Sequence, residues 1–218
     1  MAEALVATLI GDLVASRGVT DRRGLHDRLI SALASGADAL SQDLVATAPL
    51  HITVGDEFQG GFGTIGAALH ASLLIRTQLL IGQPEADLRC GIGWGSVQVL
   101  DRRTGVQDGP GWWSARDAIE EAEQLADAPS TRSVRTIARL GADREQLQDA
   151  VNAALTTRDH LLARLDNRSV RILHRLLRQE SKRDIAEAEG ISASAVSQRA
   201  YRDGLDAIVR DALLLRRI

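Results

Sequence analysis

The stretch of sequence that decides the fold class is Leu50-His-Ile-Thr-Val-Gly-Asp-Glu-Phe58. Polar and apolar residues alternate up to Val54, a turn signal follows at Gly55-Asp56-Glu57, and large apolar residues resume at Phe58 and Phe62. Alternation with a period of two, interrupted by glycine and aspartate, is typical of two strands joined by a tight turn. The sequence therefore predicts a central β-hairpin.

The patterns on both sides of this hairpin predict an α+β fold. Short, nearly continuous apolar runs are typical of buried strands, and apolar residues spaced three and four apart indicate helices. Strands are expected at residues 4–10, 50–54, 58–62, 88–94 and 96–100, the last two separated at Gly93 and Gly95, and helices at 21–40, 65–81 and 114–126. This order is that of a ferredoxin-like split βαβ sheet with its helices stacked on one face.

The composition excludes several classes of protein. Hydrophobic residues make up 44% and charged residues 25% of the 218 residues, which excludes a disordered chain. The one cysteine, Cys90, excludes a disulfide scaffold and a cysteine-rich zinc site. Glu3 precedes the apolar start of the chain and Asp12 closes it, and no stretch approaches the ~20 apolar residues of a membrane span. We therefore expect a cytoplasmic protein without a membrane partner.

The C-terminal region differs from the rest of the chain in charge and in pattern. Residues 164–218 carry 12 Lys and Arg against 8 Asp and Glu, a net charge of +4, which leaves −7 for residues 1–163 of a chain with net charge −3. A basic region favours a polyanionic partner, although small helical domains are often mildly basic. From Asp143 onward the patterns are helical only. We predict an α+β domain at residues 1–143, a connecting helix at 144–165 and an all-α second domain at 166–218.

A helix-turn-helix is predicted at Lys182-Arg-Asp-Ile-Ala-Glu-Ala-Glu-Gly-Ile-Ser-Ala-Ser-Ala-Val196. Ala186 is small where two helices would cross, Gly190 tolerates a left-handed turn, and Val196 is a branched core residue of the second helix. The exposed residues expected to contact DNA are Ser194, Ser197, Gln198 and Tyr201, with Lys182, Arg199 and Arg202 near the phosphates. We expect binding to duplex DNA as a homodimer. Such helices also serve as dimerisation or docking modules.

Acidic residues lie where the first strand and the hairpin strand end. Asp12 follows the first apolar run, and Asp56 and Glu57 lie in the hairpin turn. Because the first and third strands of a split βαβ sheet are neighbours, these carboxylates are expected to converge. Such oxygen ligands suit Mg²⁺ or Mn²⁺, which takes its other ligands from water and phosphates. Gly-Asp pairs are also ordinary turn residues.

Trp112, Trp113 and Arg116 follow a Gly-Pro-Gly turn and are candidates for nucleotide binding. The indoles could stack on a base. Arg116 lies in the first turns of its helix, where the helix dipole disfavours a positive charge, so an anionic partner is expected, either a phosphate or the carboxylates of Asp12 and Asp56. The alternatives are a core role for the indoles and a surface ion pair of Arg116 with Glu120.

Three blocks of the sequence resemble motifs of class III nucleotidyl cyclases: Leu9-Ile-Gly-Asp-Leu-Val-Ala-Ser16, Ile52-Thr-Val-Gly-Asp-Glu-Phe58 and Arg89-Cys-Gly-Ile-Gly-Trp-Gly95. Together with Asp108-Gly-Pro-Gly-Trp-Trp-Ser-Ala-Arg116 and the C-terminal helices, they make nearly the whole chain resemble the SatD family, small bacterial proteins related to the cyclase palm domain. The resemblance implies a palm domain at residues 1–143. It also implies that Asp12, Asp56 and the backbone carbonyl of Leu13 are metal ligands.

Two cyclase residues are replaced in this chain. Ile52 stands where cyclases have a lysine that reads the purine, and Trp112 stands where they have an asparagine that orients the ribose. These replacements favour binding over catalysis. We therefore expect a transcription regulator that binds a nucleotide with Mg²⁺ or Mn²⁺ and binds DNA. The alternative is a metal-dependent nucleotidyl-transfer or cyclase-type enzyme, with Arg116 as a candidate catalytic residue and the C-terminal module used for assembly.

Overall fold

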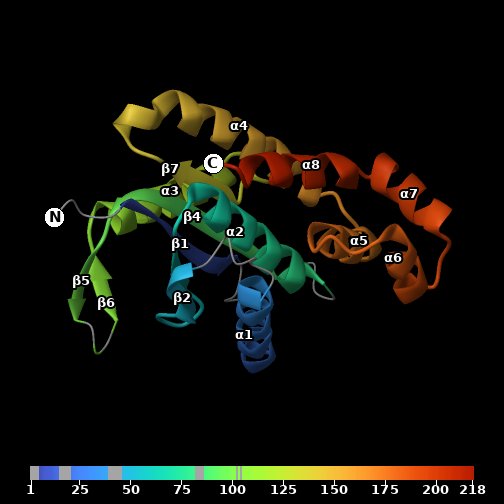
Figure 1. Ribbon diagram of the computed structural model, residues 1–218, viewed down its shortest axis with the longest axis horizontal. Coiled ribbons are helices and arrows are strands. Elements are labelled where there is room, and N and C mark those ends of the chain that lie inside the picture. The colour runs from blue at the N-terminus through green and yellow to red at the C-terminus, as the bar shows by residue number, and fades with distance from the viewer. Residues whose placement is uncertain (1–4, 15–20, 39–45, 82–85, 102, 104) are drawn as a thin grey trace.

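The computed structural model describes residues 5–14, 21–38, 46–81, 86–101, 103 and 105–218. The strands are β1 (Leu5–Val14), β2 (Ala46–Ile52), β3 (Phe58–Phe62), β4 (Asp87–Ser96), β5 (Gln98–Asp101), β6 (Val106–Asp108) and β7 (Thr136–Arg139). The helices are α1 (Arg22–Asp38), α2 (Ile65–Leu80), α3 (Pro110–Asp127), α4 (Glu145–Leu162), α5 (Asn167–Leu177), α6 (Lys182–Glu189), α7 (Ala193–Arg202) and α8 (Leu205–Leu215), with a 3₁₀ turn at Ala142–Arg144 before α4 (Figure 1). The predicted α+β class is confirmed. The predicted ends at Ala4 and Leu40, and Ala15 and Ser16 of the first quoted block, lie outside the described residues.

The main sheet has five strands in the order β2-β3-β1-β4-β7. The predicted hairpin is confirmed, because β2 pairs with β3 in antiparallel fashion and Ile52 lies opposite Phe58. β1 pairs with β3 and β4, also antiparallel, and β7 joins β4 in parallel. The sequence patterns missed β6 and β7, which have three and four residues.

The first strand does not end at Asp12, as was predicted, but continues to Val14. Its pairing with β4 runs without interruption from Leu5 opposite Ser96 to Val14 opposite Asp87, so the main-chain hydrogen bonds of both strands extend past the Gly-Asp pair. Asp12 therefore lies within the sheet and faces Arg89 on the neighbouring strand.

Gly93 and Gly95 do not break the fourth strand, which was predicted to stop at them. A Cβ atom on Gly91 would lie 2.2 Å from the backbone oxygen of Ala115, and one on Gly93 would lie 2.2 Å from that of Gly111. These glycines, with Gly95, therefore form a flat stripe on β4 against which the backbone of α3 packs. β5 follows β4 in the chain but pairs with β6 in a separate two-stranded hairpin.

Helices cover both faces of the sheet, and the prediction of a single covered face was wrong. The side chains of Leu9 and Leu13 pack in one core cluster with residues of α1, α2 and α4. The intervening Ile10 points to the opposite face and packs against Trp112 and Ile119 of α3. Side chains alternate along a strand, so the even-numbered residues of β1, Asp12 among them, lie on the face covered by α3.

The C-terminal helices form a second core that includes one side of α2. Leu73 and Leu74 of α2 pack with residues of α4 to α8, among them Ile172 and Ile208. Thr77 of α2 is also hydrogen-bonded to Nδ1 of His174 at 2.9 Å. Figure 1 places α5, α6 and α7 at the end of the molecule away from the β5–β6 hairpin. The proposed domain boundaries after residues 143 and 165 stay a prediction.

No helix in the described part of the chain is both long enough and apolar enough to cross a lipid bilayer.

Candidate functional site

Asp12 is held between β4 and α3. Arg89 lies opposite it on β4, with Nη1 3.6 Å from Oδ2 of Asp12 and 2.7 Å from Oε1 of Glu123 on α3. Because that arginine is shared with Glu123, it does not fully satisfy Asp12. Within the described residues, Oδ1 of Asp12 is shielded from solvent and has no hydrogen-bond partner.

The environment of Asp12 favours its protonated form. Burial raises the pKa of Asp12 above its ordinary value, the positive charge of Arg89 opposes the rise, and the charges of Glu123, Asp56 and Glu57 add to it. The charges of the hairpin acids therefore influence Asp12, and the predicted convergence of Asp12 and Asp56 on one ion stays a prediction. An added cation would relieve the repulsion among these carboxylates.

The hairpin turn is tied to α3 by a bidentate ion pair. Nη1 of Arg116 donates to Oε2 of Glu57 at 2.7 Å, and Nη2 donates to Oε1 at 2.9 Å. Hydrogen bonding to Arg116 lowers the pKa of Glu57. The ion-pair partner of Arg116 is thus Glu57 of the hairpin turn. The alternative was a surface ion pair with Glu120. Gly55 has φ of +65°, which gives the turn its left-handed residue.

Asp56 and Leu13 line a cavity of about 190 Å³ on the side of the sheet covered by α1. Arg22 and His26 of α1 also line it, with Leu25, Leu29 and Gly55. Asp56 therefore lines a cavity on the α1 side of the sheet, whereas Asp12 lies on the face covered by α3. Among the described residues, no group of three His, Cys, Asp or Glu side chains could hold a metal ion by itself.

The two neighbouring tryptophans have different environments. Trp112 is 9% exposed and packs on Ile10 and Ile119, and its Nε1 donates to Oε1 of Gln107 at 3.3 Å. Trp113 is 58% exposed, and its Nε1 donates to Oδ1 of Asp108 at 2.8 Å. Of the two, Trp113 alone presents its indole to solvent.

A second candidate site lies on α6 and α7. Gly190 ends α6 in the left-handed conformation with φ of +64°, and the side chains of Ser181 and Ser192 cap the starts of α6 and α7 by accepting from Asp184 and Ala195 amides. The predicted core residues Ala186 and Val196 are 6% and 0% exposed and pack in the C-terminal core.

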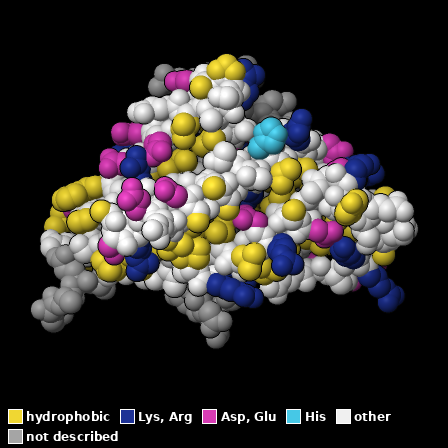
Figure 2. All heavy atoms as spheres, turned by 90° about the horizontal axis from the view of Figure 1, so that it is seen from above, with side chains coloured by type: hydrophobic (Ala, Val, Ile, Leu, Met, Phe, Trp, Pro, Cys, Tyr) yellow, Lys and Arg dark blue, Asp and Glu magenta, His cyan; other side chains and the backbone are white. Residues whose placement is uncertain are grey.

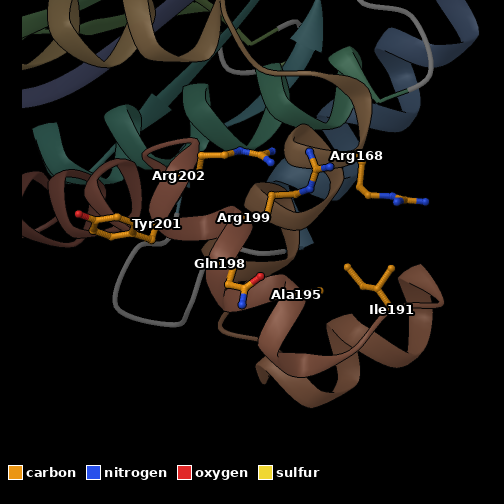
Figure 3. Close-up of a pocket in the computed structure, with 7 residues that line it drawn as sticks. All are labelled: Arg168, Ile191, Ala195, Gln198, Arg199, Tyr201 and Arg202. Carbon is orange, nitrogen blue, oxygen red and sulfur yellow. The ribbon is translucent and has the colours of Figure 1, made fainter.

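The opposite face of α7 is open to solvent. Ser194, Gln198, Tyr201 and Arg202 are exposed, Tyr201 to 86%, whereas Ser197 is half-buried. A concave surface of about 450 Å³ lies beside this face. It is lined by Arg168, Ile191, Ala195, Gln198, Arg199, Tyr201 and Arg202, whose side chains are drawn in Figure 3. Arg168 comes from α5, so the arginines of two helices meet there.

The basic side chains of this region differ in their partners. Nη1 of Arg199 donates to Asp166 at 2.8 Å and to Oγ of Ser169 at 2.8 Å, which braces α7 against the start of α5. Arg202 is 65% exposed at its side chain and pairs with its neighbour Asp203. Lys182 lies on α6, away from the concave surface, with Nζ 3.6 Å from Asp206. Exposed pairs such as those of Arg202 and Lys182 contribute little to stability.

The family model that describes the SatD family matches residues 6–214. This chain belongs to the SatD family. A search of curated proteins found no match. The SatD match extends from β1 through nearly all of α8, and so includes both candidate sites.

Sequence reasoning missed several residues at the two sites of this SatD protein. Arg89 and Glu123 surround Asp12, and Arg168 lines the surface beside α7. The position of Arg89 near Asp12 could have been predicted, because Arg89 follows Leu88 in the strand that the split βαβ order places beside β1. No spacing rule identifies Glu123 or Arg168, whose helices reach these sites only through packing.

Proposed function

We propose that this SatD-family protein is a regulator that binds duplex DNA through α7 and binds a nucleotide with Mg²⁺ or Mn²⁺ at the Asp12 site. The observation that carries the proposal is the open face of α7 beside a surface lined with arginines. The net charge of +4 on residues 164–218 supports a polyanionic partner.

The packing of α6 and α7 supports a helix-turn-helix. The left-handed Gly190, the Ser192 cap, and the buried Ala186 and Val196 are the features that this motif requires. With α6 against the phosphate backbone, α7 would enter the major groove and direct Ser194 and Gln198 toward base edges. Glutamine can pair with adenine there, whereas serine discriminates poorly.

Affinity would come mainly from contacts to phosphate. Arg168 and Arg202 lie on the same surface as Gln198, and Lys182 lies at the start of α6. Arg199 braces α7 through Asp166 and has a structural role. Each copy would make few phosphate contacts, so a single chain should bind DNA weakly. A dimer that occupies two half-sites about 34 Å apart should bind with higher affinity.

The first prediction concerns DNA. Arg168→Ala and Arg202→Ala should each weaken binding to all duplexes alike and reduce the salt slope by about 1, because each removes one phosphate contact. Gln198→Ala should instead relax sequence preference by about 1–3 kcal/mol. Fluorescence anisotropy with duplexes from the promoter region of its own gene, at several salt concentrations, measures both effects.

The matched control for this titration is Arg132→Ala, which removes an exposed arginine far along the chain from α5 to α7. Its affinity and salt slope should equal those of the unchanged protein. If Arg168→Ala and Arg202→Ala also leave both quantities unchanged, α7 does not contact DNA and serves as a docking helix.

The nucleotide half of the proposal is supported by the unsatisfied Oδ1 of Asp12 and by the neighbouring acids. The strand order β2-β3-β1-β4, all antiparallel, is the order expected of a ferredoxin-like palm. Asp12 and Asp56 would hold the ion, with the carbonyl of Leu13 beside them. Because the described residues hold no three-ligand group, phosphates and waters must complete the coordination. The ion would neutralise phosphate charge.

The second prediction is that Mn²⁺ binds only weakly alone and more tightly together with ATP or GTP. Asp12→Asn should abolish this gain while the protein stays folded, because it removes a repelling charge from an acidic cluster. Since burial raises the pKa of Asp12, binding should weaken in mild acid sooner than at an ordinary carboxylate. Isothermal titration calorimetry measures each quantity, with the exposed Asp143→Asn as control. Equal Mn²⁺–nucleotide affinity in Asp12→Asn would exclude this site.

The alternative function is metal-dependent nucleotidyl transfer with Arg116 at the reacting phosphates. Arg116 is paired with Glu57, and Trp112 is packed in the core where cyclases have a ribose-orienting asparagine. These contacts favour binding over catalysis. Mass spectrometry of the protein incubated with Mn²⁺ and ATP or GTP distinguishes the two functions. A cyclic nucleotide or pyrophosphate that forms with the unchanged protein but not with Asp12→Asn would favour the enzyme.

A further inference from the structure

Buried polar atoms without partners gather in a place that neither proposed site uses. Among the described residues, Nδ1 of His70 on α2, Nε of Arg158 on α4 and Oδ2 of Asp211 on α8 are shielded from solvent and accept or donate no hydrogen bond. Arg158 and Asp211 line the same cavity, and the positive charge of Arg158 also contributes to lowering the pKa of His70. Such atoms are rare in folded proteins, and each one calls for a missing partner.

A cavity of about 390 Å³ opens between α4 and α8 at this place. One wall is apolar and is formed mainly by Leu161, Ile208 and alanines of α4 and α8. Thr157, Arg158 and Asp211 also line the cavity. Figure 2 looks onto α4 and α8 and shows hydrophobic side chains among charged ones in the middle of this face. The volume is at the small end of the range for ligand sites.

The two charged residues of the cavity do not neutralise each other. Arg158 is 3% exposed, and the described residues give it neither a hydrogen bond nor an ion pair within 4.0 Å. A buried guanidinium without a partner is unfavourable, since its hydration is lost and nothing replaces it. The charges of Asp159 and of Asp211 on the facing helix attract it without a hydrogen bond or ion pair, and burial raises the pKa of Asp211.

We propose that the cavity between α4 and α8 binds a small zwitterion with an apolar side chain, of the α-amino-acid class. The carboxylate of the ligand would pair with Arg158, its ammonium group with Asp211, and its side chain would contact the apolar wall. The cavity charges sum to zero, so a neutral zwitterion satisfies both groups. A simple anion would be repelled by Asp211, and a simple cation by Arg158.

The test is a thermal-shift and calorimetric titration of the full chain with L-leucine, L-valine, L-methionine and L-phenylalanine. At least one should bind with a 1:1 ratio and, at about 100 times its Kd, raise Tm by roughly 5–10 °C. The matched probes for L-leucine are 4-methylpentanoate, which lacks the ammonium group, and 3-methylbutylamine, which lacks the carboxylate. Each should bind at least about tenfold more weakly, because one buried charge stays unpaired.

Three variants separate this site from binding elsewhere. Arg158→Met and Asp211→Asn should each weaken amino-acid binding about tenfold or more. Ala207→Phe fills the cavity from an exposed position and should abolish binding in a folded protein. Arg164→Met, an exposed change two residues after the end of α4, should leave affinity unchanged. The proposal is overturned if none of the four amino acids binds, if an analogue binds as tightly, or if Ala207→Phe binds as well as the unchanged protein.

Discussion

Gly91→Ala should destabilise the protein by about 3 kcal/mol or more, at the upper end of what overpacking a core costs. The added Cβ would lie 2.2 Å from the oxygen of Ala115 and 2.4 Å from the nitrogen of Ile119, both backbone atoms of α3. Backbone atoms within a helix cannot move aside singly, so α3 as a whole must shift away from β4. Urea denaturation followed by circular dichroism measures the loss.

The control for this change is Gly63→Ala, where an added Cβ meets no atom within 4 Å. It should alter stability by less than about 1 kcal/mol. Because α3 carries Arg116 and Glu123, Gly91→Ala should also weaken the Mn²⁺–nucleotide complex, which the control should not do. Equal stability of the two alanine variants would mean that α3 does not pack on the glycine stripe.

Asp159→Ala should remove about 3–5 kcal/mol of stability, because it leaves a buried arginine only partly paired. Oδ1 of Asp159 lies 2.5 Å from Nη1 of Arg76, and both side chains are almost fully buried, at 0% and 3% exposure. Oδ2 accepts from the backbone amides of Arg135 and Thr136 at 2.7 and 2.8 Å, and these donors would lose their partner as well.

A surface ion pair provides the comparison for this variant. Glu121→Ala breaks the pair with Arg139, whose side chains are 35% and 45% exposed, and should cost no more than about 1 kcal/mol. Thermal and urea unfolding of the two variants measures the difference. If Asp159→Ala costs as little as Glu121→Ala, Asp87, which also pairs with Arg76, is sufficient to hold that arginine.

Local patterns in the sequence were enough to predict most of the elements. The hairpin around Gly55 and the apolar helix from Ile65 were predicted because the residues that specify each of them are close together in the sequence. The roles of Gly91 and Gly93 were missed. Glycine in a strand indicates either an interruption or a close approach of another backbone, and only the position of α3 decides between them.

The chemistry of the candidate sites was harder to predict than the elements. Asp12 was identified from its position after an apolar run, but its partners Arg89 and Glu123 come from elements 77 and 111 residues further along. The burial of Trp112 and the exposure of Trp113 follow from their 100° separation on α3, which could be foreseen only once the buried face of that helix was known. Arg158 carried no sequence signal at all.

The burial of α2 on every side has a consequence for how the chain unfolds. Fifteen of its sixteen residues are buried, with Leu69 and Ile75 in the core of the sheet and Leu73 and Leu74 in the core of the C-terminal helices. If the C-terminal helices came away, one side of this apolar helix would face water, and if the sheet came apart, the other side would. We therefore expect the two halves to unfold in one cooperative transition, so that a destabilising mutation in either half lowers the melting temperature of both.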